Sequence, residues 1–250
     1  MPSSMSGTIR EVADVLAHAG IDLAPLGLAW ARATPSVVLI PAFGLRAMPA
    51  PARAILALAF AACIYPAIGI GPMAPRFSSG LYVVSLLTEM ARGLPVAFAA
   101  AVPLWAATMA GGVADALRAS QEQPASPVVE GAATPMGIPL SLLASAIFLA
   151  TGGPARVVGA LALRAAVDHP LLAAAEDLVG GITLAVALGG PLLAAAVVIE
   201  VAGALVARAA SPAQVHTLIA PLRALATLAV TGVVFERLAS ALARAVQAAP

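Results

Sequence analysis

The sequence predicts an all-α, polytopic membrane protein, and two observations carry this prediction. Hydrophobic residues make up 61% of the 250 residues and charged residues only 10%, whereas a soluble domain is about 45–50% apolar and about 25% charged. The apolar residues also gather in segments of about 20, the length that a helix needs to cross the hydrocarbon core of a bilayer. With so little charge, much of the surface is expected to face lipid or partner subunits.

Four apolar windows contain no charged residue, and two weaker ones are interrupted by charge. The uninterrupted windows are Ala54–Ala74, Gly93–Ala114, Met136–Ala155 and Leu178–Ile199. The weaker windows are Ile21–Ala42, with Asp22 and Arg32, and Ala209–Phe235, with His216 and Arg223. Val157–Leu163 is too short to span and either continues the preceding helix or re-enters the membrane. The windows give about six hydrophobic segments. We expect these segments to be helices, because the alternating segments of a β-barrel do not appear.

Two polar stretches interrupt this pattern. Arg118–Pro135 is rich in Pro, Ser and Ala and predicts an exposed loop between two halves, and Ala165–Asp177 predicts a second surface connection. The first twenty residues contain several charged residues and no unbroken apolar core, unlike a cleavable signal peptide. We expect an N-terminal segment over residues 1–20, followed by one helical domain over residues 21–250. Its apolar segments would themselves direct insertion, which favours the inner (plasma) membrane of a bacterium.

Prolines recur inside the apolar windows, and several pairs of adjacent glycines lie there too. Each internal proline removes a backbone donor and clashes with the preceding turn, and glycines allow close backbone approach. Two interpretations follow: a kinked, transporter-like bundle, or Pro- and Gly-broken hairpins that wrap partner subunits. The glycine pairs are Gly111-Gly112, Gly152-Gly153, Gly180-Gly181 and Gly189-Gly190.

Charged residues inside or beside apolar runs are candidate functional residues, because burying charge in a membrane is costly. Glu89 and Arg92 are three residues apart and share one helix face. They form either a proton or ion relay or, as we prefer, a local ion pair or subunit contact. Asp115 and Arg118, at the end of a helix that enters the polar loop, are predicted to form a solvated cap.

Glu200 is the other acidic residue inside a long apolar run. Arg208 follows eight residues later, about two helical turns away and too far for direct pairing. Glu200 is either a helix-end residue at the membrane interface or a contact with a partner, and we prefer the contact.

The sequence contains no pattern that predicts catalysis, a cofactor or a metal site. His18, His169 and His216 are far apart and lack metal-binding spacing, and the single Cys63 excludes a disulfide within the chain. The net charge of +1 gives no basic patch for nucleic acid. We predict a protein that is not an enzyme. The alternative class is a small proton- or ion-coupled secondary transporter, although the inverted repeat typical of that class is not found.

Four strings follow one another in a fixed order along the chain. They are Arg32 with PAFGLRAMPAPAR (Pro41–Arg53) and Tyr65-Pro66; Glu89-x-x-x-Gly93 with VPLWAATMAGGVADALRAS (Val102–Ser120); SLLASAIFLATGGPARVVGAL (Ser141–Leu161); and GPLLAAAVVIEVAGALVARAASPAQVHTLIAPLRAL (Gly190–Leu225). In this order, over about residues 21–235, they resemble the FliR/SctT family, the export-gate subunit of flagellar and injectisome type III secretion systems. Ala97 and Ala119 stand where the family has glycine, and Arg223 where it has lysine. The alanine-rich loops and short C-terminus favour the injectisome branch.

The resemblance implies a non-enzymatic subunit of an export gate in the bacterial inner membrane. Its partners would be SctR/FliP-like and SctS/FliQ-like subunits, other export-apparatus proteins and unfolded secreted substrates, in a helical assembly largely lifted out of the lipid plane. The candidate partner contacts are Glu89, Arg92, Glu200, Arg208 and Arg223. The candidate gate or pore-lining residues are Met109, Gly111 and Gly112. The alternative for the two glycines is tight helix packing.

Overall fold

In the computed structural model, every regular element of the described residues is an α-helix. The structure describes residues 22–43, 48–68, 80–117, 134–163, 169–209 and 216–249, together with Val15 and His18. Within these ranges the helices are α2 (Leu23–Leu39), α3 (Ala50–Ile68), α4 (Gly80–Leu117), α5 (Gly137–Ala150), α6 (Gly153–Leu163), α7 (Pro170–Ala209) and α8 (His216–Ala248). The all-α prediction is therefore confirmed. Most of the predicted loop Arg118–Pro135, and residues 1–20 apart from Val15 and His18, lie outside the described residues.

The helices have the length and composition of a multi-pass membrane protein. Four could each cross a bilayer, and α5 with α6 would add a fifth if the bent pair counts as one span. The four are Ala50–Ile68, Gly80–Val113, Pro170–Ala209 and Ala224–Ala248. The weaker C-terminal window, Ala209–Phe235, overlaps the span Ala224–Ala248, which lies farther along α8. The other weak window becomes α2, which has 17 residues and is not among the four.

The second predicted surface connection is wrong over most of its length, because α7 begins inside it at Pro170. A proline fits the first turn of a helix, where its missing amide hydrogen would have had no intrahelical partner. The amide of Ala173 donates to the carbonyl of His169 at 3.1 Å and closes that turn. Glu176 and Asp177 therefore lie on the helix rather than in a loop, and residues 165–168 lie outside the described part of the chain.

Internal prolines do not end the helices, whereas one glycine pair does. α2, α3, α4, α7 and α8 all continue through prolines. Between α5 and α6 the axis bends by 67°, and Gly152 has a φ of 74°, a left-handed conformation that glycine adopts readily at a helix end. At Gly153 a Cβ atom would overlap the ring of Phe148. The break at this pair therefore requires both glycines.

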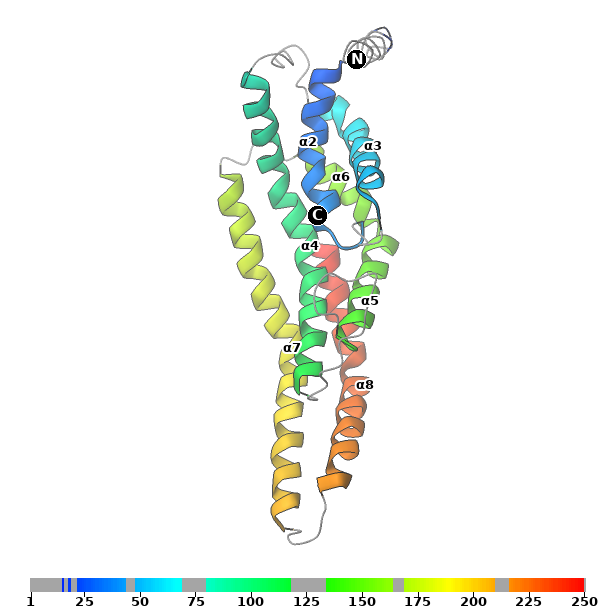
Figure 1. Ribbon diagram of the computed structural model, residues 1–250, viewed down its shortest axis with the longest axis vertical. Helices are drawn as coiled ribbons and strands as arrows, with labels where there is room; N and C mark the ends of the chain where they lie inside the picture. Colours follow the sequence, from blue (N-terminus) through cyan, green and yellow to red (C-terminus); the bar gives the residue numbers. More distant parts are fainter. Residues whose placement is uncertain are drawn as a thin grey trace, which may run out of the picture.

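Helix α4 is the central element of the bundle. It packs against α2 on one side and α7 on another, while α3 packs on α2 and α5 lies beside α4 (Figure 1). α7 continues beyond the end of α4, and α8 returns next to it as an antiparallel partner (Figure 1). With 40 residues, α7 is about 60 Å long. That is about twice the thickness of a hydrocarbon core.

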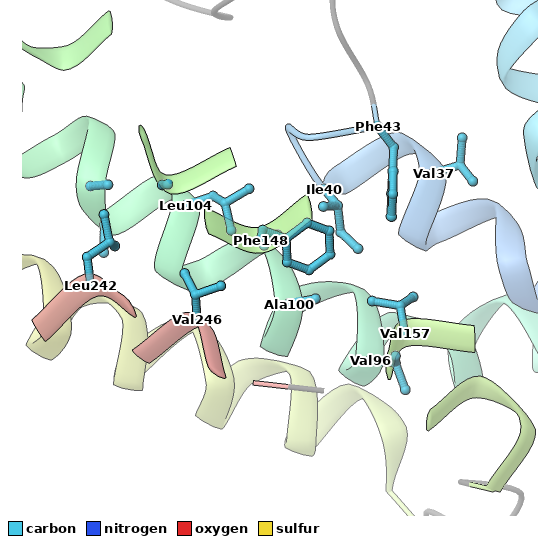
Figure 2. Close-up of a cluster of buried hydrophobic side chains, with 14 of the residues drawn as sticks. Val37, Ile40, Phe43, Val96, Ala100, Leu104, Phe148, Val157, Leu242 and Val246 are labelled. Atoms are coloured by element: carbon cyan, nitrogen blue, oxygen red, sulfur yellow. The ribbon is translucent and has the colours of Figure 1, made fainter. Parts of the chain in front are cut away.

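The hydrophobic core takes buried residues from all seven named helices. Phe148 of α5 is fully buried and sits among Ile40, Leu104, Val157 and Val246 (Figure 2). The ring of Phe43, just after α2, makes edge-to-face contacts with Phe60 of α3 at 5.3 Å and with Phe148 at 5.6 Å between ring centroids. This arrangement buries the break between α5 and α6 beneath side chains from both ends of the chain.

Arg156 of α6 fastens the C-terminal end of α8 to this core. Its Nη1 donates to the carbonyl oxygens of Val246 (3.0 Å), Gln247 (2.7 Å) and Ala249 (2.7 Å), and its Nη2 donates to the Oγ1 of Thr151 at 3.3 Å. The last carbonyls of a helix lack intrahelical donors and carry partial negative charge. The guanidinium of Arg156 supplies these carbonyls with hydrogen-bond donors and places a positive charge beside their partial negative charge.

We expect Arg156→Gln to loosen the end of α8. The change removes charge-assisted hydrogen bonds worth about 1.5–3 kcal/mol, so the last turns of α8 should become accessible to protease. Limited proteolysis of the membrane-embedded chain with a C-terminal tag measures this. Arg237→Gln, the same change at an exposed arginine of α8, is the control. Equal cleavage of the two variants would show that the Arg156 contacts do not hold the helix.

Candidate functional site

A buried ion pair joins α2 to α4. Arg32 donates from Nε to the Oε2 of Glu89 at 2.6 Å, and its Nη2 lies 2.5 Å from the same oxygen. The third guanidinium nitrogen, Nη1, donates to the carbonyl of Leu161 on α6 at 3.3 Å. The two side chains are only 3% and 7% exposed. Arg32 therefore ties three helices together in the interior.

Glu89 is shared with a second arginine. The Nη1 of Arg92, one turn farther along α4, donates to the Oε1 of Glu89 at 2.6 Å. The structure therefore contains the Glu89–Arg92 pair that their spacing predicts. It adds Arg32, which the sequence showed inside the window Ile21–Ala42 and in a family string but did not link to Glu89. The signal that could have found it was an arginine inside an otherwise apolar window, which needs a buried acidic partner.

The pair can form because α2 and α4 cross very closely. At Gly93, next to Arg92, a Cβ atom would overlap the carbonyl oxygen of Arg32. The glycine lets the backbone of α4 touch that of α2 at the level of the charges. The spacing Glu89-x-x-x-Gly93 thus places an acid and a contact point on successive turns of one helix.

Asp115 is buried rather than solvated. It is 1% exposed, and its Oδ2 accepts a hydrogen bond from the amide of Met136 at 2.6 Å. Met136 is the N-cap residue of α5, so the negative charge lies at a helix N-terminus, where it is favourable. The prediction of a solvated cap is wrong because α5 begins against the end of α4. Arg118, its proposed neighbour, lies outside the described residues.

The candidate gate segment on α4 contains two glycines in different surroundings. A Cβ on Gly111 would come within 2.5 Å of the Cα of Gly137 at the start of α5, whereas a Cβ on Gly112 would meet only the side chain of Thr134 at 3.9 Å. Met109 projects outward and is 56% exposed. Gly111 thus makes a helix-packing contact. The lining of a pore by Met109, Gly111 and Gly112 stays a prediction.

The remaining candidate contacts lie on the α7–α8 hairpin. Glu200 is half-buried in the last third of α7, and Arg208 is exposed in its last turn, where a cation suits the helix dipole. Arg223 lies on α8, but its side chain is outside what the structure describes. The structure does not bring Glu200 or Arg208 into the cluster around Glu89, which is built from α2, α4 and α6. Their role as partner contacts stays a prediction.

A comparison of the sequence with known protein families gives a match. The sequence profile of the family described as bacterial export proteins, family 1, matches residues 23–249, a range that contains all seven named helices. The chain belongs to this family, the FliR/SctT family. A comparison with curated proteins finds no match to the chain. As a FliR/SctT-family protein it is a structural component of a bacterial export apparatus, which is not a known class of enzyme.

This FliR/SctT-family protein exposes large apolar side chains over two stretches of α7, 179–186 and 197–206. The valine, isoleucine and leucine residues named below are 53–67% exposed. Exposed apolar side chains in such numbers mark contact with a membrane or with another protein. The residues are Val179, Ile182, Val186, Val197, Val198, Val201, Leu205 and Val206.

We predict that the buried pair is energetically coupled. Arg32→Gln and Glu89→Gln should each cost about 3–5 kcal/mol, because each leaves a buried charge short of its partner. The double variant should cost less than the sum of the two, with a coupling energy above about 1 kcal/mol. Pulse proteolysis of the membrane-embedded chain at rising urea concentration gives the unfolding midpoint of each variant, from which the three costs follow. Additive costs would contradict direct coupling.

The two neighbouring glycines give a second, matched test. Gly111→Ala should destabilise the protein by about 1–3 kcal/mol through overpacking against α5. Gly112→Ala should leave stability unchanged or raise it by up to about 1 kcal/mol, because alanine is the better helix former. Thermal midpoints of the two variants, together with ion leakage and secretion in cells that carry the assembled machine, are the measurements.

The same cells separate packing from gating. Lost assembly without leakage in Gly111→Ala identifies a packing residue, whereas leakage at normal assembly identifies a gate. Met109→Ala is the companion variant, because this exposed side chain makes no packing contact comparable to that of Gly111. An unchanged leak and unchanged secretion in both variants would exclude the segment from gating.

Proposed function

We propose that this protein is a non-enzymatic subunit of a type III secretion export gate in the bacterial inner membrane. It would assemble with SctR/FliP-like and SctS/FliQ-like subunits and help to form the channel through which unfolded substrate proteins cross. Membership of the FliR/SctT family supports an export role, and the structure supports the assembly.

The observation that carries the proposal is the length of the α7–α8 hairpin together with its apolar surface. α7 has 40 residues and α8 has 33, or about 60 and 50 Å of helix. A bilayer crossed at right angles covers only about 30 Å of hydrocarbon. The rest of the apolar face needs another cover, and neighbouring subunits of a helical stack would supply it.

The described acidic residues of α4 support a scaffold more than a proton-coupled transporter. A proton site needs a carboxylate that can exchange its proton with water or with a substrate. Both oxygens of Glu89 already accept from arginines, and Asp115 accepts from the amide that begins α5. These residues hold helices together, which is the role expected of a subunit that positions a channel.

The hairpin and the candidate gate segment then acquire distinct roles. Glu200, Arg208 and Arg223 would contact the neighbouring subunits. Met109, exposed on α4, would face the path of the substrate, where an apolar constriction can exclude ions by dewetting. An unfolded chain slides past small apolar residues without fixed charges to hold it.

We expect the protein to need its partners for stability. Expressed alone it should aggregate or be degraded, because its long apolar faces lack a protein cover. Co-expression with the SctR/FliP-like and SctS/FliQ-like subunits of the same genome should yield a monodisperse complex in mild detergent. Size-exclusion chromatography with mass determination measures this, and deletion of the gene should abolish type III secretion.

A lone chain that is stable, monodisperse and sufficient for transport of an ion or a small solute would contradict the export-gate proposal. Type III secretion that continues after deletion of this gene would also contradict the proposal, even if the complex forms normally.

A further inference from the structure

The cluster around Glu89 carries more positive than negative charge. Two guanidinium groups, those of Arg32 and Arg92, share the single carboxylate of Glu89. Arg32 uses all three of its nitrogens, two on Glu89 and one on the carbonyl of Leu161. Every guanidinium nitrogen of Arg32 therefore has an acceptor within the chain. The surplus positive charge therefore belongs to Arg92.

Arg92 has two guanidinium nitrogens without an acceptor in the described part of the chain. It gives one nitrogen, Nη1, to Glu89, and its side chain is 40% exposed. Among the residues that the structure describes, none accepts from its Nε or Nη2. These two nitrogens form the side of a guanidinium that binds a carboxylate through two parallel hydrogen bonds. Arg32 directs the same edge at Glu89, with both nitrogens on one oxygen, so a carboxylate is an acceptor that suits this edge of Arg92.

Arg92 lies inside a stretch of α4 that is apolar on average. This stretch is Gly80–Val113, and Arg92 is about 18 Å from its beginning and about 32 Å from its end at 1.5 Å per residue. On the preceding turns Leu81 and Val84 are 70% and 60% exposed, and the hydroxyl of Thr88, one turn before Arg92, donates back to the carbonyl of Val84. A cation amid such residues is costly unless an anion neutralises it.

The tether of Arg92 to Glu89 favours one of two sources of that anion. Because Glu89 holds Nη1, the guanidinium cannot extend freely towards a phospholipid phosphate. A carboxylate on a helix of another protein can arrive at any depth. We propose that this edge of Arg92 binds an aspartate or glutamate of a neighbouring export-apparatus subunit. Glu89 then serves to orient Arg92 rather than to touch the partner. This inference rests on the proposed export-gate function.

The test compares changes at Arg92 in the co-expressed complex. Arg92→Gln and Arg92→Glu should lower the recovered complex at least about tenfold, because they leave a partner carboxylate buried without its cation. Arg92→Lys should retain an intermediate amount, since it keeps the charge but loses the two-pronged geometry. Arg244→Gln, at an exposed arginine of α8, should assemble like the wild type. The protease-resistant pattern of each membrane-embedded variant chain is also recorded. Arg92→Gln and Arg92→Lys should keep the wild-type pattern, whereas Arg92→Glu places a second carboxylate beside Glu89 and serves mainly for the charge exchange.

A charge exchange identifies the partner residue. Each aspartate and glutamate in the apolar segments of the two partner subunits is changed in turn to arginine and combined with Arg92→Glu. Restoration of the complex by one such exchange, and not by the others, supports the proposal. Wild-type amounts of complex with Arg92→Gln and Arg92→Glu would overturn it. So would a loss of complex that no exchange restores, or the loss of co-purified anionic phospholipid with assembly intact, which would assign the edge to a phosphate.

The wild-type control separates this proposal from the function on which it rests. A wild-type chain that forms no complex with these subunits would overturn the export-gate proposal, and the partner carboxylate with it. A wild-type complex that tolerates every change at Arg92 would overturn the partner carboxylate alone.

Discussion

The crossing of α2 over α4 is the constraint on which the rest of the bundle depends. A buried arginine and a buried glutamate are tolerated only when each finds the other, because removing either from water costs several kcal/mol. Arg32 meets Glu89 only when α2, α4 and α6 stand in one register, since its last nitrogen needs the carbonyl of Leu161. Gly93 fixes the distance of the crossing. Slipping any of the three helices by one turn would strand a charge, so the cluster selects one packing among many that apolar helices could adopt.

Apolar packing alone would not select it. Leucine, valine and alanine side chains on long helices fit together in several registers at similar energy. The exposed apolar side chains of α7 therefore do not fix one register against a neighbouring helix. The aromatic contacts of Phe43 with Phe60 and Phe148 add a second fixed point. Together, the charged cluster and the aromatic contacts hold the five helices from α2 through α6 in place. Helices α7 and α8 extend the bundle and provide its long apolar surface.

Much of the fold follows from the sequence, because helix positions depend on the local run of apolar residues. The windows before and after the polar loop became helices, and the four ordered strings pointed to the FliR/SctT family that the comparison confirms. The spacing of Glu89 and Arg92 was enough to predict their contact. The second partner of Glu89 was not predictable, because Arg32 lies 57 residues away in sequence and meets it only through the crossing of two helices.

The errors have physical causes of the same kind. Asp115 looks like a solvated helix end next to a polar loop, but α5 begins against it. Pro170 and the acidic residues after it look like a surface connection, although proline also starts helices well. Four glycine pairs were visible, but nothing in the sequence marks Gly152-Gly153 as the pair that breaks a helix, because the positive φ of Gly152 and the contact of Gly153 with Phe148 appear only in the folded chain. Arg156 gave no signal at all, because its partners are backbone carbonyls that no sequence pattern marks.

The placement of α8 also has a consequence for biosynthesis. Leu242 and Val246 belong to the same core as Ile40 and Val96 (Figure 2), so the last turns of the chain complete a layer begun by its first helix. A polypeptide emerges from the ribosome N-terminus first, and contacts between such distant segments form late. Until α8 has been synthesised, the part of Phe148 that packs against Val246 has no partner from α8. A chain cut before Leu242 would leave apolar core side chains exposed, and surfaces of that kind favour aggregation.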